Sequence, residues 1–285
     1  MIKTFNYFFQ SLIIYSLFLV GRILGIKLSR LIFSRLFYLV GPFFKSDKII
    51  NLNLDIFLSE VSKYNKNEII ENMWKNYGMT FIEYIFLDKL RKSKTHIKIK
   101  GERNLLEIKR NEKPVIFVSG HFANFELMSM EITKQNVDLA TIYRPLNNNF
   151  LNPFMEHLRK KYICKNQIKK GIKGVREALN YLRKNHSIAL MIDQRVSEGE
   201  RMDFFGKPAL TTTLPAQLAT KFNLKIIPVF IERIKNNEFV LEFQKEIDPS
   251  QFKDKFELTL KLNKVIEKMI IENPNQWIWT HNRWK

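Results

Sequence analysis

Cysteine is almost absent from this chain: Cys164 is the one cysteine among 285 residues. A single thiol excludes an intramolecular disulfide and a cysteine-based zinc site. Such sparse use of cysteine is typical of a protein that faces a reducing compartment. The sequence around Cys164 has no obvious activating neighbour, so we interpret it as a bystander thiol rather than a nucleophile.

Several motifs of common enzyme classes are also missing. The sequence contains no G-x-G-x-x-G, no G-x-x-x-x-G-K-[ST], no H-E-x-x-H and no G-x-S-x-G. Their absence disfavours most nucleotide-binding proteins, zinc proteases and serine hydrolases. There is no internal repeat, and no linker is long enough to separate two globular domains.

Acidic residues are outnumbered by basic ones, with 28 Asp and Glu against 47 Lys and Arg, which gives a net charge of +19. This excess predicts a negatively charged partner, such as a phospholipid surface, a phosphorylated substrate, an acidic protein or a nucleic acid. The hydrophobic content of 45% supports a sizeable core. The length suits one large α/β domain with an appendage, or two small domains.

The N-terminus carries a long uncharged run. Thr4–Gly21 has no charge over 18 residues, which as a helix is about 27 Å, slightly short of a roughly 30 Å hydrocarbon core. A second apolar segment, Leu31–Phe44, contains only Arg35 as a charge. Basic residues mostly follow the first segment, so a spanning helix would leave the bulk of the chain in the cytoplasm. We predict a membrane anchor or interfacial helix at 1–45 and a catalytic domain at 46–285; whether the helix spans or lies on the membrane stays open.

The most informative stretch is Lys113–Met130. Pro114 opens the apolar run Val115–Val118, which predicts a short buried strand. Ser119 and Gly120 break this run, and Phe122–Glu131 then shows helical spacing. His121 is therefore predicted to lie in the turn between a strand and a helix.

His121 is followed five residues later by Glu126. Five helical residues turn the chain by about 500°, so the two side chains meet only if His121 folds back over the first helical turn. Glu126 would then hold one imidazole nitrogen and leave the other to accept a proton near neutral pH. The alternative is a chance spacing, because acidic residues are common; the strand–Gly–His–helix setting favours the pair.

Downstream, predicted strands alternate with predicted helices. The strands are expected at Val137–Tyr143, Ser187–Ile192 and Ile226–Glu232, with Glu238–Phe243 as a hairpin partner of the last. Polar residues follow the strand ends, namely Arg144, Asp193, Gln194 and Arg233. This pattern predicts an α/β fold with a mostly parallel central sheet and a site at the carboxyl edge of the strands.

Taken together, these segments resemble the lipid A biosynthesis acyltransferases, the lauroyl and myristoyl transferases that add secondary acyl chains. The resemblance covers nearly the whole chain and rests on the hydrophobic N-terminus and the blocks GHFANFE at Gly120–Glu126, Tyr143-Arg144-Pro145, Arg159, Ile192-Asp193-Gln194, Phe204–Ala209, Arg233 and the tail Trp279–Lys285.

This resemblance implies a glycerol-phosphate-acyltransferase-like fold and transfer of a fatty acyl chain from acyl carrier protein to a hydroxyl of a phosphorylated, Kdo-bearing lipid A precursor. The expected place is the cytoplasmic side of the bacterial inner membrane, with no metal and no cofactor. By resemblance, His121 is the general base and Glu126 orients it, while Arg144 or Arg159 binds phosphate or the oxyanion. Asp193 positions the acceptor or an arginine; the remaining expected substrate-binding residues are Asn124, Gln194 and Arg233.

Two alternatives remain at this point. The first is an acyltransferase for another membrane lipid; glycerolipid acyltransferases are disfavoured because the sequence lacks their E-G-T-R-type block. The second is a non-catalytic basic module that binds membranes or nucleic acid. Aromatic residues here fall mostly at core-like positions, and a hydrophobic N-terminus has no role in nucleic-acid binding, so we expect no nucleic-acid partner.

Overall fold

The computed structural model describes residues 2–104 and 113–285. Its α-helices are α1 Ile2–Phe44, α2 Asp47–Glu60, α3 Lys66–Glu83, α4 Leu87–Lys92, α6 Glu126–Lys134, α7 Asn152–Tyr162, α8 Ile172–Arg183, α9 Leu214–Phe222 and α10 Lys255–Glu272. Its strands are β1 Ile97–Lys100, β2 Ile116–Ser119, β3 Leu139–Tyr143, β4 Asn166–Lys169, β5 Ser187–Met191, β6 Glu200–Phe204, β7 Lys207–Thr211, β8 Ile226–Arg233 and β9 Phe239–Phe243.

Seven strands form one central sheet in the order β1-β9-β8-β2-β5-β3-β4. Every neighbouring pair is parallel except the β8–β9 hairpin. The predicted α/β fold with a mostly parallel sheet and the predicted hairpin partner are therefore confirmed. Strands β6 and β7 form a separate antiparallel pair.

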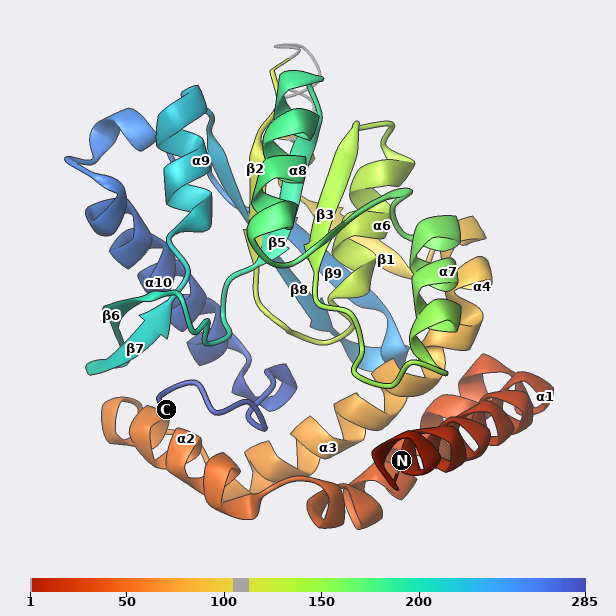
Figure 1. Ribbon diagram of the computed structural model, residues 1–285. Coiled ribbons are helices and arrows are strands. Elements are labelled where there is room, and N and C mark those ends of the chain that lie inside the picture. The colour runs from red at the N-terminus through yellow and green to blue at the C-terminus, as the bar shows by residue number, and fades with distance from the viewer. Residues whose placement is uncertain (1, 105–112) are drawn as a thin grey trace.

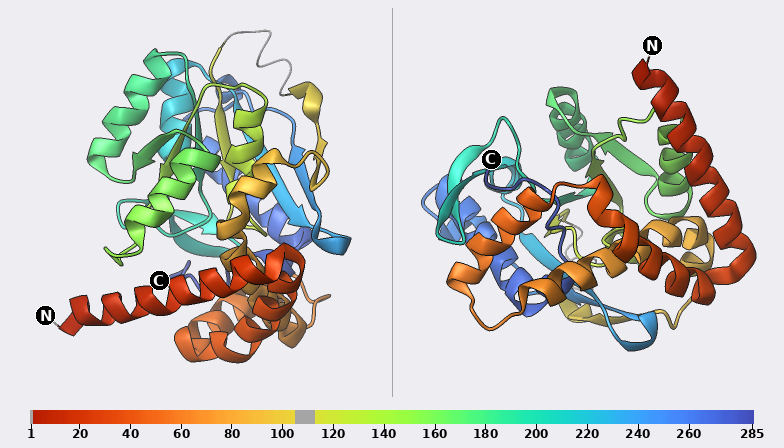
Figure 2. Two further views of the ribbon diagram at one scale, coloured as in Figure 1. Left: turned by 90° about the vertical axis from the view of Figure 1, so that its right-hand side faces the viewer. Right: turned by 90° about the horizontal axis from the view of Figure 1, so that it is seen from below.

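Helices cover both faces of the sheet (Figures 1 and 2). The chain moves outward from β2 to β3 and β4 through α6 and α7, and it returns from β4 to β5 through α8. Because parallel crossovers are right-handed, outward and returning helices lie on opposite faces. The carboxyl ends of the strands are thereby left uncovered by these helices.

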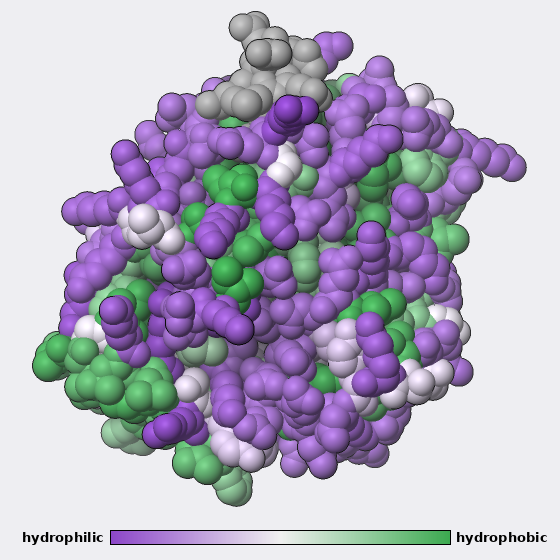
Figure 3. All heavy atoms as spheres, turned by 180° about the vertical axis from the view of Figure 1, so that it is seen from behind, coloured by the Kyte–Doolittle hydropathy of each residue, from purple (hydrophilic) through white to green (hydrophobic). Residues whose placement is uncertain are grey.

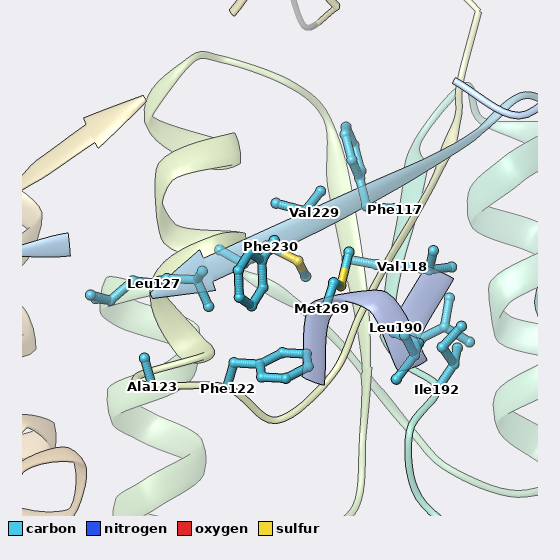
Figure 4. Close-up of a cluster of buried hydrophobic side chains, with 14 of the residues drawn as sticks. Phe117, Val118, Phe122, Ala123, Leu127, Leu190, Ile192, Val229, Phe230 and Met269 are labelled. Carbon is cyan, nitrogen blue, oxygen red and sulfur yellow. The ribbon is translucent and has the colours of Figure 1, made fainter. Parts of the chain in front are cut away.

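The core beneath this edge is apolar and fully buried. Figure 4 shows Phe117 and Val118 of β2 near Val229 and Phe230 of β8, with Met269 of α10 beside Val118. The four residues of β2 are all buried, as expected for a central parallel strand. Phe122, the residue after His121, packs its ring edge-on against Phe230 with 5.1 Å between ring centroids. The core thus fixes the backbone on which the candidate base is carried.

Helices α1, α2 and α3 form a layer along the edge where the strands end (Figure 1). α1 bends at Gly25, whose φ of 76° and ψ of 163° are not helical. It packs closely on α3, since a Cβ at Gly78 would lie 2.0 Å from the carbonyl oxygen of Phe33. The α1–α3 contact therefore requires glycine at position 78.

Three local elements differ from the sequence-based expectation. Helix α6 begins at Glu126 rather than near Phe122, because the backbone before it is tied to other parts of the chain. The edge strand β4 was not predicted; its short sequence NQIK is mostly polar. The block Phe204–Ala209 contains the tip of the β6–β7 hairpin, whose two strands were not predicted; Phe205 and Gly206 at this tip both have positive φ.

Candidate functional site

Neighbouring strands bring His121 and Asp193 together. β2 and β5 are paired in parallel with Ser119 opposite Met191. His121 and Asp193 each follow those partners by two residues, so they leave the sheet at the same level. The Nδ1 atom of His121 lies 2.8 Å from Oδ1 of Asp193. The predicted site at the carboxyl edge of the sheet is thus where these two side chains meet.

Asp193 is held on both of its carboxylate oxygens. Its Oδ2 accepts hydrogen bonds from the backbone N–H of His121, at 2.9 Å, and from Nε1 of Trp277, at 2.8 Å. Only 1% of Asp193 is exposed. Burial alone would raise the pKa of this carboxyl, but the His121 charge and these hydrogen bonds lower it to about 2. Asp193 is therefore an anion that presents only acceptors to the imidazole.

This geometry corrects the expected partner of the imidazole. Glu126 was predicted to hold a nitrogen of His121, and Asp193 was predicted to position the acceptor or an arginine. In the structure Asp193 holds Nδ1, while Glu126 bonds to Tyr84 and Arg159. The late start of α6 leaves Glu126 at its first position, where it faces α7 instead of the turn that carries His121.

The turn around His121 is fixed by three separate segments. Ala123 has a φ of 44°; its N–H donates to the carbonyl of Gln276, and its carbonyl accepts from the hydroxyl of Thr80. Phe122 forms a β-bridge with Trp277. A side chain at Gly120 would meet the ring of Phe122 at 2.6 Å and the side chain of Asp193 at 3.3 Å. The turn therefore requires glycine at position 120 to let Asp193 reach His121.

Glu126, Arg159 and Tyr84 form a second polar cluster. Arg159 donates from Nε to Oε1 of Glu126 at 2.8 Å, and the hydroxyl of Tyr84 donates to the same oxygen at 2.5 Å. Arg159 is only 9% exposed, and its Nη1 has no hydrogen-bond partner among the described residues. The attraction of Glu126 outweighs burial and raises the pKa of Arg159, which stays a cation.

A cavity of about 220 Å³ connects the two groups of residues. Its polar lining includes the predicted residues His121, Glu126, Arg144, Arg159 and Gln194, and its apolar lining includes Phe125, Met128, Ile142, Ile163, Ala189 and Leu190. Arg144 is exposed. The cavity thus combines a candidate base, four basic side chains (Arg144, Arg159, Lys170 and Arg195) and an apolar wall, which suits an acidic or phosphorylated molecule with an apolar chain.

Two predicted substrate-binding residues lie outside this cavity. Asn124 donates to Oε2 of Glu83 at 2.8 Å, and Arg233 binds both oxygens of the same carboxylate. Glu83 is fully buried and is also paired with Arg30 of α1 at 2.6 Å. The two arginines overcome the cost of burial and lower the pKa of Glu83. Asn124 and Arg233 therefore belong to a buried network that joins α1, α3 and β8 beneath the His121 turn, which corrects their expected place.

The C-terminal tail adds residues that the sequence analysis left without a role. Trp277 bonds to Asp193, and His281 lines the cavity. The backbone N–H of Arg195 donates to Nε2 of His281 at 2.9 Å. No local spacing relates this tail to Asp193, because Trp277 lies 84 residues away from it along the chain.

His281 is expected to make the protein less stable in mild acid. Burial lowers the pKa of its imidazole from 6.5 to about 4, so between these values the unfolded chain binds a proton that the folded one does not. The contribution of the neutral His281 imidazole to the free energy of unfolding is therefore fully present above pH 6.5 and is lost as the pH falls toward 4. Thermal melting across pH 4–7 should show a shallower decline in His281→Gln. The control His157→Gln, at an exposed position of α7, should melt like the wild type. If the melting temperature falls with pH at the same slope in all three proteins, His281 is not the cause of the acid sensitivity.

These features define a mostly parallel α/β protein in which a buried Asp193 holds the partly exposed imidazole of His121 against a cavity lined by basic and apolar residues. The whole of 2–285 matches the model of the family described as bacterial lipid A biosynthesis acyltransferase. The chain therefore belongs to this family and is an acyltransferase of lipid A biosynthesis.

Individual relatives agree with the family. The chain is 25% identical to the lipid A biosynthesis lauroyltransferase of Escherichia coli (strain K12) over 84% of this chain and 78% of the relative. It is 22% identical to the lipid A biosynthesis palmitoleoyltransferase of the same strain, over 88% and 83%. Among solved structures, a 1-acyl-sn-glycerophosphate acyltransferase from Thermotoga maritima aligns with a TM-score of 0.43 and 14% identity, covering 89% of this chain and 100% of that one.

Proposed function

We propose that this protein transfers a fatty acyl chain from acyl carrier protein to a hydroxyl of a phosphorylated, Kdo-bearing lipid A precursor, at the cytoplasmic side of the bacterial inner membrane. The observation that carries the proposal is the His121–Asp193 pair, which faces a cavity that also contains Arg159. An acidic carrier protein and a phosphorylated acceptor both suit a chain with a net charge of +19.

Asp193 determines which imidazole nitrogen acts as the base. Because the carboxylate is ionised and can only accept, Nδ1 of His121 carries the proton and Nε2 keeps its lone pair. Nε2 removes the proton from the acceptor hydroxyl while the oxygen of that hydroxyl attacks the thioester carbonyl. The tetrahedral intermediate then expels the carrier thiolate, which takes the proton back from the imidazolium. Asp193 stabilises that imidazolium. Because the acceptor oxygen itself attacks the thioester, the proposed reaction has no covalent enzyme intermediate.

Arg159 supplies positive charge for this reaction. It is buried, lines the cavity, and its Nη1 amino group has no hydrogen-bond partner among the described residues. A buried guanidinium with a free donor stabilises the oxyanion or holds a phosphate of the acceptor. Glu126 and Tyr84 fix the direction of this guanidinium, so we assign Glu126 a positioning role toward Arg159. Arg144 and Gln194 line the same cavity as further substrate contacts.

Trp277→Phe should lower kcat about tenfold, since the ring is retained while one hydrogen bond to Asp193, worth about 1.5 kcal/mol to a charged group, is lost. Trp279→Phe is a matched control: Trp279 is also buried and packs edge-on against Trp277, but its Nε1 donates to the carbonyl of Pro274. Steady-state kinetics should show lower kcat with similar KM only for Trp277→Phe. Equal effects of both substitutions would indicate a purely structural role for Trp277.

The donor and acceptor are tested together by offering the purified protein two donors and two acceptors. The donors are acyl carrier protein thioesters and coenzyme A thioesters of the same chain, and the acceptors are a Kdo-bearing lipid A precursor and lysophosphatidic acid. The proposal expects one added chain on the lipid A precursor, with a higher kcat/KM for the carrier protein thioester. Acylation of lysophosphatidic acid but not of the lipid A precursor would contradict the proposed acceptor. Equal kcat/KM for the two donors would contradict the proposed preference for acyl carrier protein.

A further inference from the structure

Helix α1 presents an apolar surface that nothing in the described structure covers. Of 21 exposed large apolar side chains among the described residues, 16 lie on α1. They include Phe5, Phe9, Ile13, Leu19 and Ile23 before the bend, and Leu28, Ile32, Leu39, Phe43 and Phe44 after it. Seen from behind, hydrophobic residues gather at the lower left, where α1 lies (Figure 3). Continuous apolar surface of this kind marks a binding surface on an otherwise polar molecule.

The first half of α1 is attached to the body along its length instead of projecting from it. The hydroxyl of Ser11 bonds to Asn148 at 2.9 Å, and the hydroxyl of Tyr15 donates to the carbonyl of Phe150 at 2.9 Å. Phe18 is buried against Phe81, with 4.9 Å between ring centroids. To cross a bilayer, this half would have to release all of these contacts.

The bend and the second half are attached in the same way. Arg22 binds Asp88 through both terminal nitrogens, and Arg30 reaches the buried Glu83. The hydroxyl of Ser29 donates to the carbonyl of Gly21, which closes the bend at Gly25. Viewed from the side, α1 runs across the base of the molecule, and viewed from below its halves bend around that base (Figure 2).

We propose that α1 does not span the membrane but lies in the plane of one leaflet, with both halves embedded by their apolar face. Length and hydropathy alone would allow α1 to cross a bilayer, yet two halves joined by a bend and fixed to the body cannot cross together. Exposed Lys27, Arg35, Lys45 and Lys48 flank the apolar residues and suit an anionic lipid surface.

The position of α1 in one leaflet also places the cavity near the lipid surface. The α1 residues Ser11 and Tyr15 contact the segment between β3 and α7. That segment follows Tyr143, begins with Arg144 and leads to α7, which carries Arg159; these three residues all line the cavity. A lipid acceptor therefore enters from the leaflet in which α1 lies. This inference rests on the proposed function in two respects, namely that the protein works at a membrane and that its acceptor is a lipid.

The test measures the depth of α1 in vesicles of phosphatidylethanolamine and phosphatidylglycerol. In full-length protein with Cys164→Ser, which removes the buried native thiol, single cysteines are introduced as Phe9→Cys, Ile23→Cys, Ile32→Cys and Leu39→Cys. Each is labelled with an environment-sensitive fluorophore and quenched by lipids that carry a nitroxide at defined depths. Ile172→Cys is the control, since Ile172 is 80% exposed but lies on α8, away from α1.

The proposal expects all four labels on α1 at one common shallow depth and no lipid quenching of the Ile172→Cys label. A spanning helix would instead separate the labels at positions 9 and 23 by about 21 Å along the bilayer normal, at 1.5 Å per residue. That separation would overturn the proposal, as would an absence of lipid quenching at all four positions. Acyl transfer is not the readout, so failure of the proposed reaction and failure of this inference are distinguishable.

Discussion

Replacing His121 by alanine is expected to lower the rate of acyl transfer by about 10²- to 10⁴-fold, because the acceptor hydroxyl loses its general base. The backbone contacts of the turn do not use the imidazole: the N–H of residue 121 still reaches Asp193, and Ala123 keeps its bonds to Gln276 and Thr80. The variant should therefore remain folded and bind vesicles. Transfer rates, thermal melting and vesicle co-sedimentation measure the three properties separately.

The control for this variant is His186→Ala, which removes an imidazole that contacts the backbone carbonyl of Lys184. It should transfer acyl chains at the wild-type rate. A His121→Ala protein that is folded and retains near-wild-type turnover would exclude His121 as the base. Loss of folding in His121→Ala would be recognised by melting, in which case His121→Gln provides the comparison.

Asp193→Asn is expected to be almost as damaging, with a loss of about 10³- to 10⁴-fold in kcat, on the scale of other catalytic histidines left in the wrong tautomer. The amide has only one acceptor atom, and two fixed donors, the N–H of His121 and Nε1 of Trp277, point to the position of Oδ2. The amide oxygen takes that position, so the NH₂ group faces Nδ1 of His121. Nδ1 must then accept, the proton moves to Nε2, and the base is blocked.

Single-turnover rates check this result, with Asp203→Asn as the control. Asp203, on β6, is a partly exposed carboxylate paired with Lys264 and lies outside the central sheet and outside the cavity lining, and its substitution should leave the rate unchanged. Trp277→Phe combined with Asp193→Asn gives a second check. Without the indole donor, only the N–H of His121 still favours the amide oxygen at the position of Oδ2. The introduced side-chain amide can then rotate to exchange its oxygen and NH₂ group in part of the molecules, so the double variant should regain part of the lost rate. An Asp193→Asn enzyme with wild-type kcat would exclude Asp193 as the residue that orients His121.

The sequence predicted the edge of the sheet where the site lies, because strand-forming runs end in polar residues at His121, Arg144 and Asp193. It did not predict that His121 pairs with Asp193. The two residues are 72 positions apart, and their contact depends on β2 and β5 being adjacent in the sheet. Strand order of this kind is set by tertiary packing and is not expressed in local spacing.

The local His121–Glu126 spacing was misleading for a related reason. A helix from Phe122 onward would follow from periodicity alone, but Ala123 takes a positive φ to satisfy its bonds to the C-terminal tail and to α3. Asn124 and Arg233 were expected to bind substrate because of the family resemblance. Instead they satisfy Glu83, a fully buried carboxylate that needs several donors. A buried network of this kind becomes visible only once three distant segments are placed together.

The central claim is that His121, held by Asp193, catalyses transfer of one acyl chain to the lipid A precursor. The most direct measurement is mass spectrometry of the Kdo-bearing precursor after incubation with acyl carrier protein thioesters and either wild type, His121→Ala or Asp193→Asn. The predicted result is a gain of one acyl chain with the wild type and almost none with either variant at equal protein concentration. A gain of one chain at equal rates in all three proteins would contradict the claim.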